Sequence, residues 1–160
     1  MIFNLNKFRS PKLYKKYYLK FIFWELIKIL FFNTSLPCSK LRVKILRIFG
    51  ASVGDKVIIK PNVKIKYPWN LKIGNSTWIG EGVWIDNISN VTIGNNTCIS
   101  QGVYICSASH DIKSESFDLK LQPVFIGNNC WIAAKCIIGP NTSISDDKFI
   151  KIGQVVTKTI

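Results

Sequence analysis

The chain has 160 residues, which suits one domain with a substantial hydrophobic core. Its five cysteines show no CxxC or other metal-binding spacing. The longest apolar stretch, Phe21 to Phe32, contains Glu25 and Lys28 and is shorter than the about 20 residues of a membrane span. These features argue against a zinc module, a disulfide framework and a transmembrane helix. We expect reduced thiols and a cytoplasmic protein without a signal peptide.

The net charge of +13 is concentrated near the start of the chain. Residues 1–50 contain eleven Lys and Arg and the single acid Glu25, giving +10, whereas residues 51–160 contain eleven Lys and Arg and eight acids, giving +3. Such a basic block favours an anionic partner: a membrane surface, a nucleic acid or an acidic protein. No nucleic acid is expected, because the block lacks the interleaved aromatic and basic residues of known nucleic-acid-binding modules.

Two helices are predicted in this basic segment. Residues 12–32 are rich in aliphatic and aromatic residues and contain neither Gly nor Pro. A second helix is predicted at residues 40–49, with Ser39 as its N-cap and Gly50 at the C′ position. On the second helix an apolar side should oppose a basic side: Leu41, Ile45, Ile48 and Phe49 against Lys40, Lys44 and Arg47.

From Val53 onward, aliphatic residues recur every six positions. Residues 70–85 align with residues 90–105 at an offset of twenty, and nine of the sixteen aligned positions are identical. A period of six is typical of a hexapeptide solenoid, in which three short strands make one triangular coil and the aliphatic residues point inward. We therefore predict an all-β solenoid at residues 51–160, preceded by a basic helical segment at residues 1–50.

Equivalent side chains of successive coils should stack about 4.8 Å apart. The offset of twenty then places Trp84 beside Tyr104 and Asp86 beside Cys106. Three tryptophans directly follow the small inward position and should face outward, as a subunit interface or a ligand platform: Trp78, Trp84 and Trp131.

Small residues have two predicted places in the coil. Gly-Asn pairs at 74–75, 94–95 and 127–128 should form corners, where the backbone needs conformations that these residues tolerate. Cys130 and Cys136 occupy the small inward position, where a free cysteine behaves as a buried apolar residue.

The chain contains one histidine, His110, at the point where the repeat gives way to a loop predicted at residues 111–125. The repeat resumes at Ile126. A side chain at the end of a rigid coil should be firmly held and exposed at an edge. Imidazole exchanges protons near neutral pH and could deprotonate a sugar hydroxyl, although spacing alone leaves a structural role open for a lone histidine.

Two roles are open for the predicted helices. They can lie on the cytoplasmic membrane surface, with apolar faces in the interface and basic residues near the lipid headgroups. They can also cover the first coil and pack on neighbouring subunits, because an uncovered end coil exposes apolar surface. The two roles are compatible.

Six runs carry a family signature: IKPNVKIKYPW (59–69), WIGEGVWIDN (78–87), VTIGNNTCISQGVYIC (91–106), SHD (109–111), IGNNCWIAAK (126–135) and VVTK (155–158). In these runs the chain resembles the hexapeptide-repeat O-acetyltransferases, most closely the colanic-acid-type acetyltransferases of exopolysaccharide gene clusters. The resemblance implies a left-handed parallel β-helix and a homotrimer with active sites between subunits. It also implies acetyl-CoA as the donor and a sugar hydroxyl, on a small molecule or a lipid carrier, as the acceptor.

His110 matches the general base of this family, which deprotonates the acceptor hydroxyl for direct attack on the thioester. The resemblance implies that Asp111 could orient the imidazole and that Trp84 and Asp86 could bind the acceptor sugar. Alternatively, Trp84 could lie in a subunit interface and Asp86 could form a corner of the coil; these structural roles remain equally open. No metal is implied, since a zinc hydratase on the same fold would need three histidine ligands.

Four positions match the coenzyme A groove of the family: Ala134, Ile152, Thr157 and Lys158. Ala134 is small enough for pantetheine to lie against backbone amides, and Lys158 could contact a phosphate. Ile152 departs from the Ala or Gly of relatives, which also continue beyond the VVTK run into a GNPA-like motif. The alternative prediction is therefore a catalytically inactive β-helix scaffold.

Overall fold

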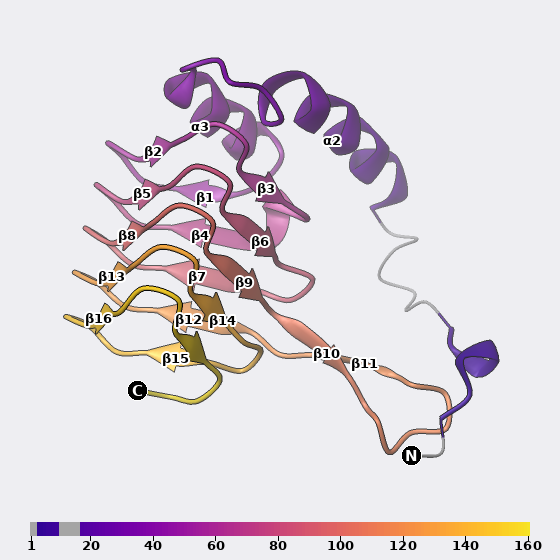
Figure 1. Cartoon of the computed structure of the whole chain (residues 1–160). Coiled ribbons are helices and arrows are strands. Elements are labelled where there is room, and N and C mark those ends of the chain that lie inside the picture. Colours follow the sequence, from indigo (N-terminus) through magenta and orange to yellow (C-terminus); the bar gives the residue numbers. More distant parts are fainter. Residues whose placement is uncertain (1–2, 10–16) are drawn as a thin grey trace.

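The computed structural model describes residues 3–9 and 17–160, and its main body is a triangular solenoid (Figure 1). Three five-stranded parallel sheets form its walls. Sheet A consists of β1 (Ser52–Val53), β4 (Leu71–Ile73), β7 (Val91–Ile93), β12 (Val124–Ile126) and β15 (Ser143–Ile144). Sheet B consists of β2 (Ile58–Ile59), β5 (Trp78–Ile79), β8 (Cys98–Ile99), β13 (Trp131–Ile132) and β16 (Phe149–Ile150). Sheet C consists of β3 (Lys64–Ile65), β6 (Trp84–Asp86), β9 (Tyr104–Cys106), β14 (Ile137–Ile138) and β17 (Val155–Val156).

Each wall sends one column of aliphatic side chains into the bore. In sheet B the column is in register and at most 4% exposed: Ile59, Ile79, Ile99, Ile132 and Ile150. Burial of such columns is the main favourable contribution to the folding of this solenoid, at about 25 cal/mol per Å² of apolar surface. The predicted hexapeptide solenoid is confirmed, as are the stacking of Trp84 on Tyr104 and of Asp86 on Cys106.

The corner between sheets A and B is held by a ladder of side-chain oxygens. Four backbone amides each donate to the equivalent side-chain oxygen of the next coil at 2.7–2.8 Å: those of Asp55, Asn75, Asn95 and Asn128. The glycine before each amide is required for space rather than for the turn. A Cβ added to Gly94 would lie 2.6 Å from the backbone of Gly127, while the left-handed conformation falls on Asn96, with φ 51°.

The two helices predicted before the solenoid are α2 (Tyr18–Phe31) and α3 (Ser39–Ile48). Predicted helical residues 12–16 lie outside the described residues. The N-cap of α3 is Cys38 rather than the predicted Ser39, whose hydroxyl instead accepts a hydrogen bond from the Ile59 amide at 2.9 Å. Gly50 terminates α3 with φ +93°, as predicted. Two short 3₁₀ helices complete the fold: η1 (Leu5–Lys7) and η2 (Pro68–Asn70).

The predicted apolar side of α3 is wrong in part. Leu41 and Ile48 are 39% and 70% exposed, whereas Arg42, Val43 and Leu46 are buried. The helix turns this second side toward the coil because the Arg42 guanidinium donates to the Ile59 carbonyl of the first coil at 3.4 Å and to the Leu36 carbonyl before α3 at 2.6 Å.

Helix α2 covers the first coil together with α3, as predicted (Figure 1). Trp24 is fully buried, and its indole N–H donates to the Ile65 carbonyl at 2.9 Å. The opposite side of α2 is apolar and exposed: Tyr18, Leu19, Ile22, Phe23, Leu26, Ile29 and Leu30. Within residues 3–9 and 17–160, no helix has the length and apolar character needed to cross a membrane.

Residues 108–121 form an arm that leaves the solenoid after β9 (Figure 1). Its strands β10 (Ala108–His110) and β11 (Leu119–Leu121) pair antiparallel. The segment 111–125 is therefore not an irregular loop but half of a hairpin, and the solenoid resumes at Val124, two residues before the predicted Ile126. The domain division at residue 50 remains a prediction, and helices and coils share one hydrophobic cluster.

Candidate active site

His110 ends strand β10 and is held by Phe117 across the arm. Its Nδ1 lies 2.7 Å from the Phe117 carbonyl oxygen. Since a carbonyl only accepts, Nδ1 carries the proton and Nε2 presents a lone pair. The Phe117 ring stacks on the imidazole with centroids 4.2 Å apart and planes 7° apart. The imidazole is thus fixed in one tautomer, with its basic nitrogen away from the hydrogen bond.

Phe117 adopts a backbone conformation that is rare for a bulky residue, with φ 51°. The turn around it fixes this conformation, because its amide donates to the Ser114 carbonyl at 3.1 Å. The Ser114 and Ser116 hydroxyls donate to the Asp118 carboxylate at 2.6 and 2.8 Å. These two hydrogen bonds lower the pKa of Asp118. The polar turn therefore aims the Phe117 carbonyl at the imidazole.

Asp111 follows the histidine, but its carboxylate engages the other strand of the arm. Its Oδ2 lies 2.9 Å from Lys120 Nζ, and its Oδ1 accepts from the Lys113 amide at 2.9 Å. The hydrogen bond from Lys120 is the largest cause of the lowered pKa of this half-buried carboxyl. The group that orients His110 Nδ1 is the Phe117 carbonyl.

Trp84 and Asp86 lie on sheet C together with Tyr104, as the repeat predicts. Trp84 is 46% exposed, and its ring centroid lies 4.8 Å from that of Tyr104. Asp86 forms an ion pair with Lys66 at 3.1 Å and accepts from the Tyr104 hydroxyl at 3.4 Å. Burial, followed by the contacts with Cys106 and Asp86, raises the pKa of Tyr104. An exposed aromatic platform therefore stands beside a carboxylate.

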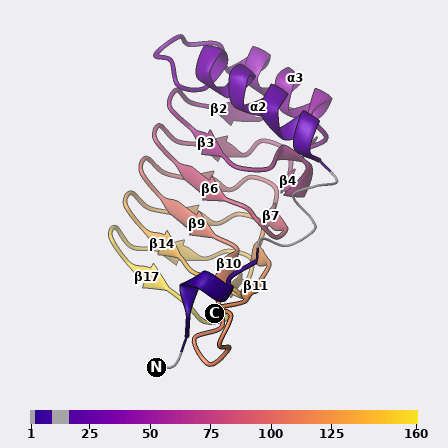
Figure 2. The same cartoon turned by 90° about the vertical axis from the view of Figure 1, so that its right-hand side faces the viewer.

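The four positions matched to the coenzyme A groove lie at the two ends of the strands of sheet C, the wall that Figure 2 shows from the front. Ala134 and Ile152 form the corner that enters the sheet, where the Gly153 amide donates to the Ala134 carbonyl at 2.9 Å. Ile152 is 71% exposed. Thr157 and Lys158 follow β17 at the opposite, C-terminal end of the strand, and both are exposed. The arm that carries His110 and Asp111 leaves the solenoid after β9, at the same end of the sheet C strands as Thr157 and Lys158, whereas Trp84 and Asp86 lie in the sheet itself.

One cysteine, Cys106, adjoins Asp86 in sheet C. All five cysteines are free thiols, and Cys130 and Cys136 are buried as predicted. Burial raises the pKa of Cys130, which favours the unreactive thiol. Among residues 3–9 and 17–160, no three His, Cys, Asp or Glu side chains are grouped closely enough to hold a metal ion.

Comparison with known proteins places this chain and its fold in a family. No protein-family profile matches the chain. WcaF of Escherichia coli (strain K12), assigned as a colanic acid biosynthesis acetyltransferase, is 34% identical over 139 residues, covering 87% of this chain and 76% of WcaF.

Two solved structures share the fold at comparable identity. A maltose O-acetyltransferase from Clostridium difficile 630 superposes with a TM-score of 0.83 at 29% identity, covering 96% of this chain and 82% of that one. A galactoside acetyltransferase in complex with coenzyme A superposes with a TM-score of 0.79 at 28% identity, covering 89% and 72%. The left-handed parallel β-helix and the catalytic class are thereby confirmed. The chain belongs to the hexapeptide-repeat acetyltransferases, with WcaF among its relatives.

Two residues of the site do not stand out in the sequence. Tyr104 occupies an ordinary outward repeat position, and only its alignment with Trp84 hints at a platform. Phe117 is one of two aromatic residues in the segment 111–125, and polar residues flank it on both sides. An aromatic residue in such a context was the one available signal.

Proposed function

We propose that this protein transfers an acetyl group from acetyl-CoA to a sugar hydroxyl in surface polysaccharide or glycan assembly, with His110 as the general base. The observation that carries the proposal is the fixed tautomer of His110, whose Nε2 is left as a proton acceptor. The relatives supply the reaction class, because WcaF and the two solved relatives are acetyltransferases.

The chemistry requires one proton to move twice. Nε2 accepts the proton of the acceptor hydroxyl as its oxygen attacks the thioester carbonyl carbon of acetyl-CoA. The tetrahedral intermediate collapses, the carbon–sulfur bond breaks, and the imidazolium returns the proton to the departing thiolate. The Phe117 carbonyl stabilises the imidazolium, since Nδ1–H donates to it at 2.7 Å throughout. Asp111 remains a proposed support of the imidazole at longer range.

For the acceptor, we assign the platform of Trp84 and the carboxylate of Asp86. A hollow of about 390 Å³ adjoins Trp84 between α2 and sheet C, lined by Phe21, Lys64 and Lys66 among others. Sugars bind by stacking a ring face on an aromatic side chain while carboxylates and amides accept from hydroxyls. The exposed Trp84 and the adjacent hollow, whose lining includes Glu25 and Asn33, fit that chemistry.

For binding of the donor, we assign the residues that flank the strands of sheet C: Ala134, Ile152, Thr157 and Lys158. Ala134 permits close approach of pantetheine to the backbone, and the exposed Lys158 ammonium can contact a phosphate. The exposed Ile152 side chain offers an apolar contact where relatives are smaller. We further propose a homotrimer that places these residues against a neighbouring subunit. Light scattering should then give a mass in solution of three times 18.2 kDa.

The test is incubation of the protein with acetyl-CoA and a panel of nucleotide-linked and lipid-linked sugars. Release of free thiol together with an acetylated sugar, identified by mass, is the expected result. If no sugar is acetylated and calorimetry detects no acetyl-CoA binding, the inactive scaffold is the correct alternative.

Paired variants should separate the two substrate sites. We expect Trp84→Ala to raise KM for the acceptor about 5- to 10-fold through lost stacking, with little change in KM for acetyl-CoA. Lys158→Ala should raise KM for acetyl-CoA about 3- to 10-fold and leave KM for the acceptor unchanged. Each variant is the control for the other. Equal changes in both constants for either variant would contradict its assignment.

We also propose that the outer side of α2 binds the anionic surface of the cytoplasmic membrane. A helix that is apolar on both its buried and its exposed side needs a second apolar surface to shield the exposed side from water. Exposed basic residues of α3 lie beside it at the same end of the solenoid: Lys40, Lys44 and Arg47. A lipid-linked acceptor would meet the enzyme on this surface.

Flotation with vesicles tests the membrane proposal. We expect the protein to float with vesicles rich in anionic lipid and not with zwitterionic ones, because Lys and Arg near the surface contribute about 1 kcal/mol each. Leu26→Glu combined with Ile29→Glu should abolish flotation, whereas Phe149→Glu on exposed sheet B should not. Unchanged flotation of the double variant, or its conversion to monomers, would overturn the proposal and in the latter case assign α2 to a subunit interface.

A further inference from the structure

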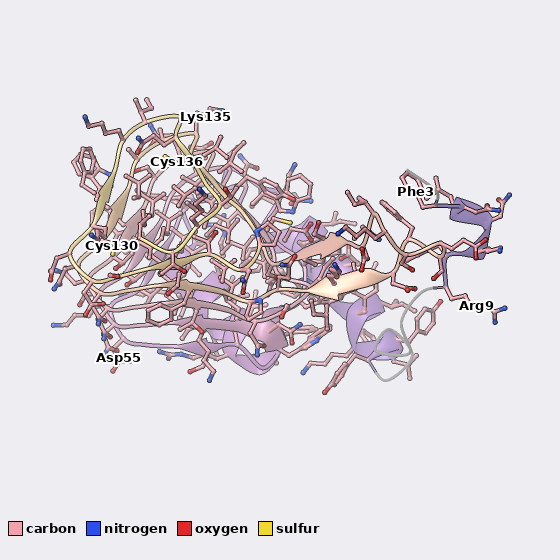
Figure 3. The ribbon with its side chains drawn as sticks, turned by 90° about the horizontal axis from the view of Figure 1, so that it is seen from below. Phe3, Arg9, Asp55, Cys130, Lys135 and Cys136 are labelled. Carbon is pink, nitrogen blue, oxygen red and sulfur yellow. The ribbon has the colours of Figure 1, made fainter. Side chains whose placement is uncertain are left out.

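The first described segment of the chain packs against the arm that carries His110. We call residues 3–9 the strap. The Asn4 amide donates to the Glu115 carbonyl at 2.8 Å, and Lys7 forms an ion pair with the Glu115 carboxylate. Figure 3 shows Phe3 and Arg9 at the arm, on the far side of the molecule from the corner at Asp55. The strap therefore contacts the catalytic segment through both backbone and side chains.

The aromatic residues of the strap extend the ring contacts of the histidine. The Phe3 ring lies 4.7 Å from the Phe117 ring, which in turn stacks on His110. Phe8 contacts the imidazole directly, and the two rings form a T-shaped pair with a centroid distance of 5.5 Å and an interplanar angle of 63°. Both strap aromatics are half-buried, while Leu5 between them is 62% exposed. Phe8 thus contacts the imidazole, whereas the ring contact of Phe3 is with Phe117.

The contacts of Phe8 and Phe117 restrict different motions of the imidazole. The hydrogen bond to the Phe117 carbonyl fixes the position of Nδ1, and the stacked ring fixes the plane. The ring can still shift within that plane about the hydrogen bond through small changes in χ1 and in the arm backbone, because stacked rings tolerate in-plane offsets. A second aromatic contact at a steep angle to the first blocks this movement. The position of Nε2 then depends on the strap.

We propose that Phe8 is a positioning residue of the acetyl-transfer site and that the strap completes this site. The inference rests on the proposed role of His110 as the base. Displacement of a reacting group by about 1 Å can lower a rate by two orders of magnitude, so a contact that only orients the imidazole has a measurable effect on turnover.

Replacement of Phe8 tests the proposal, with replacement of Phe3 as the matched control in the same segment. We expect Phe8→Ala to lower kcat about 10- to 100-fold with KM for acetyl-CoA unchanged within about twofold. Phe8→Tyr should restore kcat because it keeps the ring, and Phe3→Ala should stay within about threefold of wild type. Unchanged turnover of Phe8→Ala, or equal losses in Phe8→Ala and Phe3→Ala, would overturn the positioning role.

The single histidine makes a second readout possible that does not depend on activity. Nitrogen-15 NMR of the one imidazole should show a protonated Nδ1 and an unprotonated Nε2 in the folded protein. Phe8→Ala should shift the ring proton signals through loss of the aromatic ring current, whereas Phe3→Ala should leave them in place. If these signals move and wild type acetylates no sugar, the contact stands and the proposed function fails. If Phe8→Ala leaves them unmoved, the strap does not position the imidazole.

Discussion

His110→Ala is expected to lower kcat/KM for acetyl transfer about 10²- to 10⁴-fold, the usual contribution of a general base. No other imidazole is available in the chain to replace it. Initial rates of thiol release, measured with saturating acetyl-CoA and varied acceptor, give the value. The oligomer mass should be unchanged, because the side chain lies on the arm and outside the buried columns of the solenoid.

Asp111→Asn is the matched control for this variant. The Asp111 carboxylate pairs with Lys120, and the orienting hydrogen bond of His110 goes to the Phe117 carbonyl. We therefore expect Asp111→Asn to retain turnover within about fivefold, since an exposed ion pair contributes little. A loss as large as that of His110→Ala would instead make Asp111 the orienting group. Full turnover of His110→Ala would reject the general-base assignment.

The solenoid was predictable because the same pattern of inward and outward residues recurs in each coil. The inward column of sheet B is isoleucine at every level, and one register explains all of its members. The corners were predicted at the right residues but for an incomplete reason. Gly94 is needed because the next coil approaches it closely, and a backbone approach between coils is invisible in a pattern read along the chain.

The helices were less predictable because tertiary contacts override local pattern. Arginine is normally exposed, so the predicted buried side of α3 does not include Arg42, although this residue is fully buried. The site shows the same limit. The position of His110 followed from the break in the repeat, but Phe8 is 102 residues earlier in a segment without periodicity. Only the folded arm brings the two rings to 5.5 Å.

Arg42 joins the N-terminal helices to the first coil without a carboxylate partner. Its guanidinium donates to four backbone carbonyls: those of Phe31 (2.9 Å), Thr34 (3.3 Å), Leu36 (2.6 Å) and Ile59 (3.4 Å). Burial lowers the pKa of the guanidinium. Its hydrogen bonds to the carbonyl dipoles offset this cost of burying the charge. The end of α2, the connection to α3 and strand β2 therefore meet on one side chain.

Arg42→Ala is expected to reduce the free energy of unfolding by about 3–5 kcal/mol, since each buried carbonyl left without a donor costs about 1–3 kcal/mol and water reaches some of them. Arg47→Ala is the matched control on the same helix. Arg47 also donates to coil carbonyls, those of Val53 at 2.9 Å and Gly54 at 2.7 Å, but its side chain is 47% exposed. Water can replace those bonds, so its loss should cost less than about 1 kcal/mol. Guanidinium unfolding of both variants at one protein concentration measures the difference, and equal losses would show that burial of Arg42 does not set the stability of the helical cover.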